Sequence, residues 1–216
     1  MIVYDTFEDF IRLIGRESEV ASRMRDEDLV KRALEGDDSA FRELHDRYIG
    51  QVFRYAYLQT GDYHRSEEIA QDVMYKMAVN LATYKGKSSF KTWLFTIGRR
   101  VVIDYHRKYR KDRALTYLQH DQLNKVRDRF YNEQEFLQHS SQEKLLSCLE
   151  KLSPDDKTVL YLRFFEGMSI KETAKVMSKT VMAVKSLQTR AKKKLLSHLQ
   201  SEVNEEYEKT ERTAGQ

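Results

Sequence analysis

Basic side chains dominate one stretch near the C-terminal end of the chain, between Glu172 and Glu202, where no acidic residue occurs. The basic residues of this interval include Lys179, Lys185, Arg190, Lys192, Lys193 and Lys194. A solvated helix face usually mixes charges of both signs, whereas a stripe of one sign is typical of a surface that binds phosphate groups. The stretch therefore predicts DNA binding, with a plain helical hairpin as the alternative.

Two helices and a turn are predicted around these charges. Ser169 and Glu172 have the spacing of a capping box, so a first helix begins at Ile170. Residues 178–180 break the apolar periodicity, and Thr180 caps a second helix. This second helix turns Val181, Val184 and Leu187 inward and carries Lys185, Ser186, Thr189 and Arg190 on its other faces. The pattern is typical of a helix-turn-helix, whose second helix enters a DNA major groove.

A second basic region lies near the middle of the chain. Residues 84–91 form a flexible basic loop, and Ser89 or Thr92 caps the helix that follows. The apolar positions of that helix are Trp93, Leu94, Ile97, Val101 and Val102. Its exposed side is largely basic and carries Arg99, Arg100, Asp104, His106, Arg107, Lys108, Arg110, Lys111 and Arg113. These groups predict phosphate contacts, which weaken steeply as salt rises because binding releases counterions.

Aromatic residues are interleaved with these basic groups, namely Tyr84, Phe90, Phe95, Tyr105 and Tyr109. Aromatic rings are stacking surfaces for unpaired bases. Core packing is the alternative for each ring, and it is the preferred interpretation for Phe90 and Trp93. The loop itself is therefore where we expect contact with nucleic acid.

No arrangement of residues suggests an enzyme. A nuclease or recombinase would need clustered carboxylates for a metal, or a nucleophile with a base beside it. The 6 histidines are scattered along the chain, and no Walker loop is present. We therefore expect no catalytic residue, no metal site and no cofactor.

Composition indicates an all-α chain of two small helical domains joined by a flexible linker. Gly 8 and Pro 1 are low counts for 216 residues, and long segments of helical periodicity carry good helix formers. We expect an N-terminal extension (1–24), a first domain (25–111), a linker (112–140), a helix-turn-helix domain (141–200) and an acidic tail (201–216). The extension is an additional packing helix, a frayed segment, a stretch that precedes a true start at Met24, or a helix that docks on a partner. We expect the tail to be disordered at its end.

The compartment is expected to be the cytoplasm. Cys148 is the single cysteine, which excludes an intrachain disulfide and fits a reducing environment. No apolar run approaches the roughly 18 residues that a membrane-spanning helix needs.

Helix boundaries can also be predicted in both domains. Asp38 or Ser39 caps a long helix that ends at residues 60–62, and Ser153 caps a helix with Pro154 in its first position. Residues 64–78 form another helix, which turns Ile69, Val73 and Met77 toward the core. The outer face of that helix carries Glu67, Glu68, Gln71 and Asp72. From composition alone this face is ordinary solvated surface, with a protein-docking surface as the alternative.

Over about residues 26–199 the chain resembles bacterial sigma factors of the small, extracytoplasmic-function (ECF) type. The similar stretches are 28–41 with Tyr48, 66–73, 90–97 with Val102-Ile103-Asp104 and the basic run after it, 152–164, and the helix-turn-helix. They occur in the order and spacing of that family. A duplex-binding transcriptional regulator without sigma activity remains the alternative, although it would leave the basic and aromatic region of the first domain without a role.

The resemblance implies partners and roles for particular residues. The first domain would dock on core RNA polymerase through Glu68, Gln71 and Asp72, and would capture and open the minus-ten element of promoter DNA. The minus-ten set implied is Lys85, Lys87, Ser88, Ser89, Phe90, Lys91, Arg99, Arg100, Asp104 and Arg107. The second domain would read the minus-thirty-five element as duplex, through Thr180, Lys185, Ser186, Thr189, Arg190 and Lys193. An anti-sigma factor, in many family members anchored in the membrane, would mask both DNA surfaces.

The chain departs from the family pattern at a few positions. Members commonly have glycine in the turn where this chain has Ser178, and a small polar residue where it has Arg100. The implied fold is not affected by these differences, but the promoter sequence does not follow from the resemblance.

Overall fold

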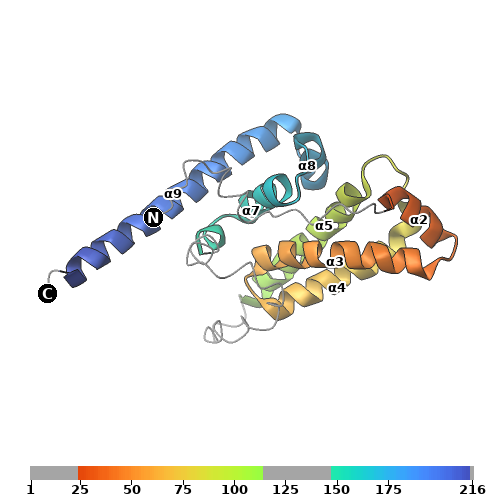
Figure 1. The fold of residues 1–216 in the computed structure, drawn as a ribbon, viewed down its shortest axis with the longest axis horizontal. Coiled ribbons are helices and arrows are strands. Elements are labelled where there is room, and N and C mark those ends of the chain that lie inside the picture. Colours follow the sequence, from red (N-terminus) through yellow and green to blue (C-terminus); the bar gives the residue numbers. More distant parts are fainter. Residues whose placement is uncertain (1–23, 114–146, 215–216) are drawn as a thin grey trace.

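In a computed structural model, the chain is described over residues 24–113 and 147–214, and its side chains over residues 24–108 and 147–201. Every element in these ranges is helical, which confirms the all-α prediction (Figure 1). No helix within them is long and apolar enough to cross a membrane. The expectations for the N-terminal extension before Met24 and for most of the linker fall outside the described residues.

The first domain consists of α2 (Asp26–Leu34), α3 (Asp38–Thr60), α4 (Tyr63–Asn80), the short 3-10 helix η1 (Leu81–Thr83) and α5 (Phe90–Arg113). The helices α3 and α4 run side by side, and α5 packs against both of them (Figure 1). The predicted inward residues of α4, namely Ile69, Val73 and Met77, are all buried. The expected inner face of this helix is thereby confirmed.

The start of α3 differs from the prediction by one residue. Asp37, rather than Asp38 or Ser39, is the cap, and its carboxylate accepts from the backbone N–H of Ser39 at 2.9 Å and of Ala40 at 3.2 Å. Gly36 adopts a φ of 95°, which turns the chain sharply and leaves Asp37 as the first extended residue before the helix. The hydroxyl of Ser39, the N–H of Ala40 and the guanidinium of Arg32 lower the pKa of Asp37.

Phe90 holds the beginning of α5. Its ring is completely buried and lies 5.4 Å from the ring of Tyr48, 5.6 Å from Tyr84 and 5.4 Å from Trp93, measured between centroids. Ser89 precedes it and caps the helix, because its hydroxyl accepts from the N–H of Thr92 at 3.3 Å. Both ends of the 84–89 loop are thus tied to one aromatic cluster.

The second domain consists of helical residues 147–150, α7 (Pro154–Leu160), the π-helical turn η2 (Tyr161–Phe165), α8 (Ile170–Met177) and α9 (Val181–Ala214). Ser153 caps α7 with Pro154 in the first position, as predicted. Val184, Ala191 and Leu195 are buried and attach α9 to the domain. The acidic tail was expected to end in disorder, but α9 continues as a helix to Ala214. No proline or glycine interrupts the chain between Val181 and Gly215.

The turn between α8 and α9 contains a strained residue. Ser178 has a φ of 52° and a ψ of 43°, the left-handed conformation that favours glycine. The N–H of Ser178 donates to the carbonyl of Lys175 at 3.2 Å, and the N–H of Lys179 donates to the carbonyl of Ala174 at 3.0 Å. These two bonds form a Schellman motif, which fixes the angle at which α9 leaves α8.

The two domains are in contact, α8 with α5 and α7 with α3. The centre of this boundary is aromatic: the ring of Tyr161 lies 5.5 Å from that of Tyr55 and 6.1 Å from that of Phe95. The Tyr161 hydroxyl donates to the carbonyl of Gln51 at 2.7 Å, and Thr158 lies 3.2 Å from the hydroxyl of Tyr55. This packing was not predictable from local patterns in the sequence.

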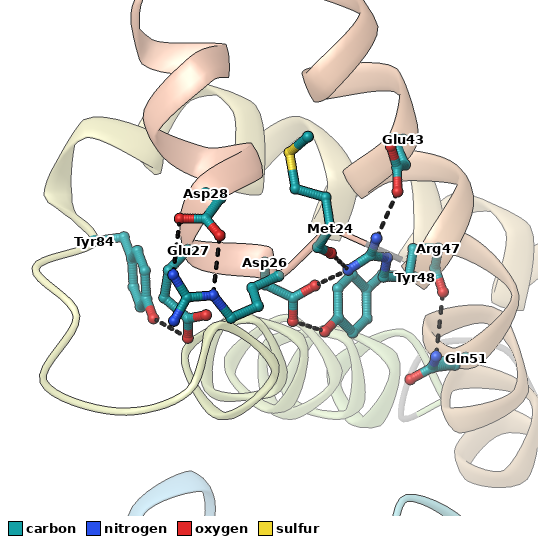
Figure 2. A network of polar contacts seen from close by, with 10 residues as sticks. Met24, Asp26, Glu27, Asp28, Glu43, Arg47, Tyr48, Gln51 and Tyr84 are labelled. Atoms are coloured by element: carbon teal, nitrogen blue, oxygen red, sulfur yellow. Dashed lines mark hydrogen bonds and ion pairs between the residues drawn. The ribbon is translucent and has the colours of Figure 1, made fainter. Parts of the chain in front are cut away.

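A polar network joins α2 to α3 (Figure 2). The carboxylate of Asp26 accepts from the guanidinium of Arg47 at 2.5 Å and from the hydroxyl of Tyr48. Arg47 also donates to Glu43 at 2.6 Å and to the carbonyl of Met24 at 3.0 Å. Burial, together with the nearby Asp26 carboxylate, raises the pKa of Tyr48 far above its usual value, so the phenol remains a donor.

The replacement Tyr48→Phe tests this network. The variant keeps the ring in the core but removes the donor to a charged, partly buried acceptor, so the free energy of unfolding should fall by about 1.5 kcal/mol. The measurement is urea unfolding followed by far-UV circular dichroism. The exposed Tyr75→Phe is the control and should change the free energy of unfolding by under about 0.5 kcal/mol. Equal effects in the two variants would contradict the role of the network.

The replacement Ser178→Gly tests the strained turn. A left-handed L-residue costs about 1–2 kcal/mol, and the extra freedom of glycine in the unfolded chain offsets part of the relief. We therefore expect a gain of about 0.5–1 kcal/mol in the same unfolding measurement. The matched control is Ser197→Gly, in the interior of α9, which should instead lose about 0.5 kcal/mol. A loss in Ser178→Gly would contradict the strain.

Candidate nucleic-acid interface

The second domain presents the face of α9 that sequence reasoning selected. A capping box formed by Ser169 and Glu172 starts α8, and the hydroxyl of Thr180 accepts from the N–H of Ala183 at 3.1 Å to start α9. The six residues chosen on this face, Thr180, Lys185, Ser186, Thr189, Arg190 and Lys193, are all exposed. The structure thus brings this set together on one helix, with its N-terminal part free to enter a groove.

Met182 is a residue of this face that sequence reasoning missed. Its side chain is 76% exposed, in the first turn of α9 and one turn before Lys185 and Ser186. An apolar side chain in such a position can contact the methyl group of thymine. The sequence does contain a signal for its exposure. Val184 faces the core, and a residue two positions earlier in a helix lies on a different face, so Met182 cannot also face inward.

The basic loop of the first domain is partly ordered by its own side chains. The hydroxyl of Tyr84 donates to the carbonyl of Ser88 at 2.8 Å, and the ammonium of Lys85 donates to the carbonyl of Ala82 at 3.1 Å. Gly86 has a φ of 68°, which the turn requires, and Lys87 is exposed. The loop therefore has a definite shape, with two lysines on its surface.

One member of the predicted minus-ten set does not lie on the surface. Phe90 has no exposed area, so in this structure it cannot contact DNA, and the prediction that it does so is corrected. Core packing, the interpretation that the residues favoured for Phe90, is confirmed, and it holds also for Phe95, which is 1% exposed. The cause is tertiary: α3 supplies Tyr48 and Tyr55 as partners for these two rings, which the local sequence does not reveal.

The outer side of α5 carries the rest of the set. Arg100 is exposed, and Asp104 and Arg107 are exposed and form an ion pair at 3.2 Å. Arg99 is different, because its guanidinium is half-buried and donates to Asp155 of the second domain at 3.2 Å. The polar side chains of Arg100, Asp104 and Arg107 are thus exposed on α5, whereas Arg99, just before them, is bonded to the second domain.

Several groups of the minus-ten set are already bonded to carboxylates of the second domain. Lys91 pairs with Glu166 at 3.0 Å, and the hydroxyl of Ser89 donates to Glu172 at 3.1 Å. Burial opposes ionisation of Asp155, but the Lys179 ammonium and the Arg99 guanidinium outweigh it and lower the pKa of that carboxyl. Asp155 is therefore charged at neutral pH.

The outer face of α4 is mixed rather than purely acidic. Glu68 and Gln71 are exposed, and Asp72 pairs with Lys76 at 2.5 Å. Sequence reasoning missed two exposed apolar residues beside them, Tyr75 at 67% and Val79 at 59% exposure. Exposed large apolar groups next to polar ones are typical of protein-docking surfaces.

Metal ions have no obvious place in the described parts of the chain. Residues 24–113 and 147–214 contain no group of three or more His, Cys, Asp or Glu side chains that could hold one.

Comparison with known families matches both domains. Residues 44–112 match the model of Sigma-70 region 2, and residues 142–195 match the model of Sigma-70, region 4. The region 2 match includes the α4 face, the basic loop and α5, and the region 4 match includes the helix-turn-helix.

Individual relatives agree with these matches. The ECF RNA polymerase sigma factor SigX of Bacillus subtilis is 31% identical over 166 residues, which are 76% of this chain and 85% of that protein. The corresponding factor BldN of Streptomyces coelicolor is 33% identical over 166 residues, 76% of this chain and 62% of that protein. The sigma factor RpoE of Bartonella quintana, solved in complex with the anti-sigma factor NepR, has a similar fold. Its TM-score is 0.61 at 19% identity, over 74% of this chain and 96% of that one. The chain belongs to the ECF-type sigma factors of the sigma-70 family, which are not enzymes and direct transcription initiation through promoter recognition by regions 2 and 4.

Proposed function

We propose that this sigma factor binds core RNA polymerase in the cytoplasm through the outer face of α4, and grips promoter DNA at two places. The basic loop and α5 capture the melted minus-ten strand, and α9 reads the minus-thirty-five element as duplex. The observation that supports the proposal is that the two sets proposed to contact DNA lie on separate domains and that Lys85, Lys87, Arg100 and Arg107 of the first set and all six residues of the second are exposed. A regulator that binds duplex alone has no use for the first of these surfaces.

Upstream recognition falls to the first turns of α9. Lys185 and Arg190 are long, exposed donors suited to guanine, and a good contact of this kind discriminates by about 1–3 kcal/mol. Ser186 and Thr189 add short donors and acceptors, and Met182 adds an apolar contact for thymine. Lys193 lies farther along the helix and contacts phosphate, which adds affinity without sequence information.

Strand opening falls to the first domain. A base that leaves the duplex loses stacking worth a few kcal/mol, which contacts in a pocket or loop must restore. Lys85, Lys87 and Ser88 supply such contacts from the loop, and Arg100 and Arg107 supply phosphate contacts from α5. Phe90 acts indirectly, because its burial holds the loop and the helix start in one position.

Polymerase docking falls to Glu68, Gln71 and Asp72, with Tyr75 and Val79 providing apolar area beside them. Mixed surfaces of this kind bind tightly where an apolar centre is surrounded by polar groups. An anti-sigma factor is a further partner, as it is for the Bartonella quintana RpoE whose fold is similar.

Run-off transcription with core polymerase on a promoter library tests the function. Adding the protein should give promoter-specific initiation. Lys185→Ala and Arg190→Ala should each weaken selection of the upstream element by about 1–3 kcal/mol while leaving polymerase affinity unchanged. Duplex binding without any promoter-specific initiation would replace the proposal with the regulator, and reduced polymerase affinity in both variants would contradict the assignment of α9.

Polymerase affinity tests the docking face. Tyr75→Ala removes an exposed apolar anchor and should weaken binding of core polymerase by about 1–2 kcal/mol, since aromatic residues at an interface centre carry much of the affinity. The measurement is fluorescence titration of labelled protein with core polymerase. The exposed Arg42→Ala, on α3, is the control and should bind as the unchanged protein does. Normal affinity in Tyr75→Ala would remove this residue from the docking surface.

A further inference from the structure

A polar side chain, that of Gln188, lies in the inward stripe of α9. The other members of this stripe, Val184, Ala191 and Leu195, are apolar and buried. The amide oxygen of Gln188 accepts from Nε of Arg163 at 3.1 Å. In packed helices, a single polar residue in an apolar seam fixes the register of the helix against its neighbours. The bond to Arg163 therefore has a geometric consequence as well as an energetic one.

Arg163 is itself held firmly by the fold. It comes from the π-helical turn η2, where the N–H of Glu166 donates to the carbonyl of Tyr161 at 3.0 Å. The guanidinium also donates to the carbonyl of Met168, just before α8. Turns of this kind are rare and occur frequently at functional sites. Arg163 thus joins three parts of the domain: η2, the turn that leads into α8, and α9.

The opposite side of the stripe is held by α7. The almost completely buried carboxylate of Asp156 accepts from the ammonium of Lys194 at 2.6 Å. With about 100° of rotation per residue, positions 188 and 194 lie on opposite sides of the line through Val184 and Leu195. The helix is therefore held from two sides, which restricts its rotation about its own axis.

Rotation of α9 decides which base edges its outer side chains reach. Lys185, Thr189 and Arg190 point away from the stripe and are exposed. A rotation of about 10° moves a side-chain end that lies about 6 Å from the helix axis by roughly 1 Å. A hydrogen bond to a base edge tolerates only a few tenths of an ångström. Apolar packing has no direction and would permit such a rotation, whereas the bond to Gln188 opposes it.

We propose that Arg163 is a positioning residue for upstream recognition, which holds Gln188 and thereby sets the rotation of α9. The inference rests on the proposed function of α9, and it assigns part of the promoter selectivity to a pair of side chains behind the reading face. The pair determines selectivity more than affinity, because phosphate contacts such as that of Lys193 carry no sequence information.

Transcription from a promoter library tests the proposal. The full-length protein is combined with core polymerase, and the library is randomised over the minus-thirty-five and minus-ten elements. The selection ratio is the enrichment of the preferred upstream sequence over its single-base variants. Gln188→Leu removes the acceptor at similar side-chain size and should lower this ratio about fivefold, as expected when a base contact is displaced. Preferences at the minus-ten element should not change.

Further variants separate positioning from packing. Gln188→Glu keeps an acceptor for the guanidinium and should retain the selection ratio within about twofold. Arg163→Met should lower the ratio as Gln188→Leu does, and the double variant should lower it no further, because both side chains act through one bond. Thermal unfolding should show that Gln188→Leu is at least as stable as the unchanged protein, since leucine adds apolar area to the stripe.

Two controls accompany these variants. Gln200→Leu makes the same chemical change at an exposed position farther along α9, outside the stripe, and should leave the selection ratio unchanged. Lys185→Ala removes a proposed base contact and should lower the ratio at the minus-thirty-five element.

An unchanged selection ratio in Gln188→Leu, together with a lower one in Lys185→Ala, would overturn the inference and leave the proposed function of α9 intact. An unchanged ratio in both would contradict the proposed function on which the inference rests. Equal losses in Gln188→Glu and Gln188→Leu would overturn the role of the acceptor. Losses that add in the double variant with Arg163→Met would show that the two side chains act separately, which would also overturn it.

Discussion

The placement of one ring, that of Tyr161, determines how the two domains lie together. The ring packs at a tilt against Tyr55 and Phe95 of the first domain, and its hydroxyl donates to the carbonyl of Gln51 at 2.7 Å, which satisfies this polar group at the boundary. Burial raises the pKa of Tyr161 well above its usual value, so the phenol stays neutral and keeps donating. Around this ring, α7 packs against α3 and α8 packs against α5, and charged side chains of the two domains pair at the same boundary.

Local signals in the sequence were sufficient to predict those features that depend on residues within one helical turn of each other. The capping box of Ser169 and Glu172, the start at Ser153 and Pro154, and the end of α3 at residues 60–62 were all predicted and are all present. Each depends on a side chain or a backbone conformation acting on groups at most four residues away. The inner face of α4 was predictable for a similar reason, because a buried stripe repeats with the period of the helix.

The errors concern what distant parts of the chain do to one another. The resemblance placed Phe90 among the DNA contacts, whereas the residues themselves favoured core packing, and the structure confirms the core: Tyr48 and Tyr84, which come from elements far away in sequence or across a loop, enclose the ring. The cap of α3 was misplaced because Asp37, Asp38 and Ser39 are all good caps, and only the backbone at Gly36 decides among them. Met182 and Tyr75 were overlooked because exposure of an apolar side chain is visible only after its neighbours are packed.

The contact between the domains could not be predicted for a more specific reason. Two of the acidic residues that form it already have a role within their own helices. Glu172 completes a capping box, and Asp155 lies in the first turn of α7, where a negative charge complements the helix dipole. Both residues are therefore fully accounted for by the helix starts, and the sequence does not indicate a second role for them. The same exposure and charge that suit a carboxylate to a helix start also let it reach across to Ser89 or Arg99. Of the three, Glu166 caps no helix through its side chain and is nearly buried, and its ion pair with Lys91 of the first domain, at 3.0 Å, has no local counterpart that the sequence could indicate.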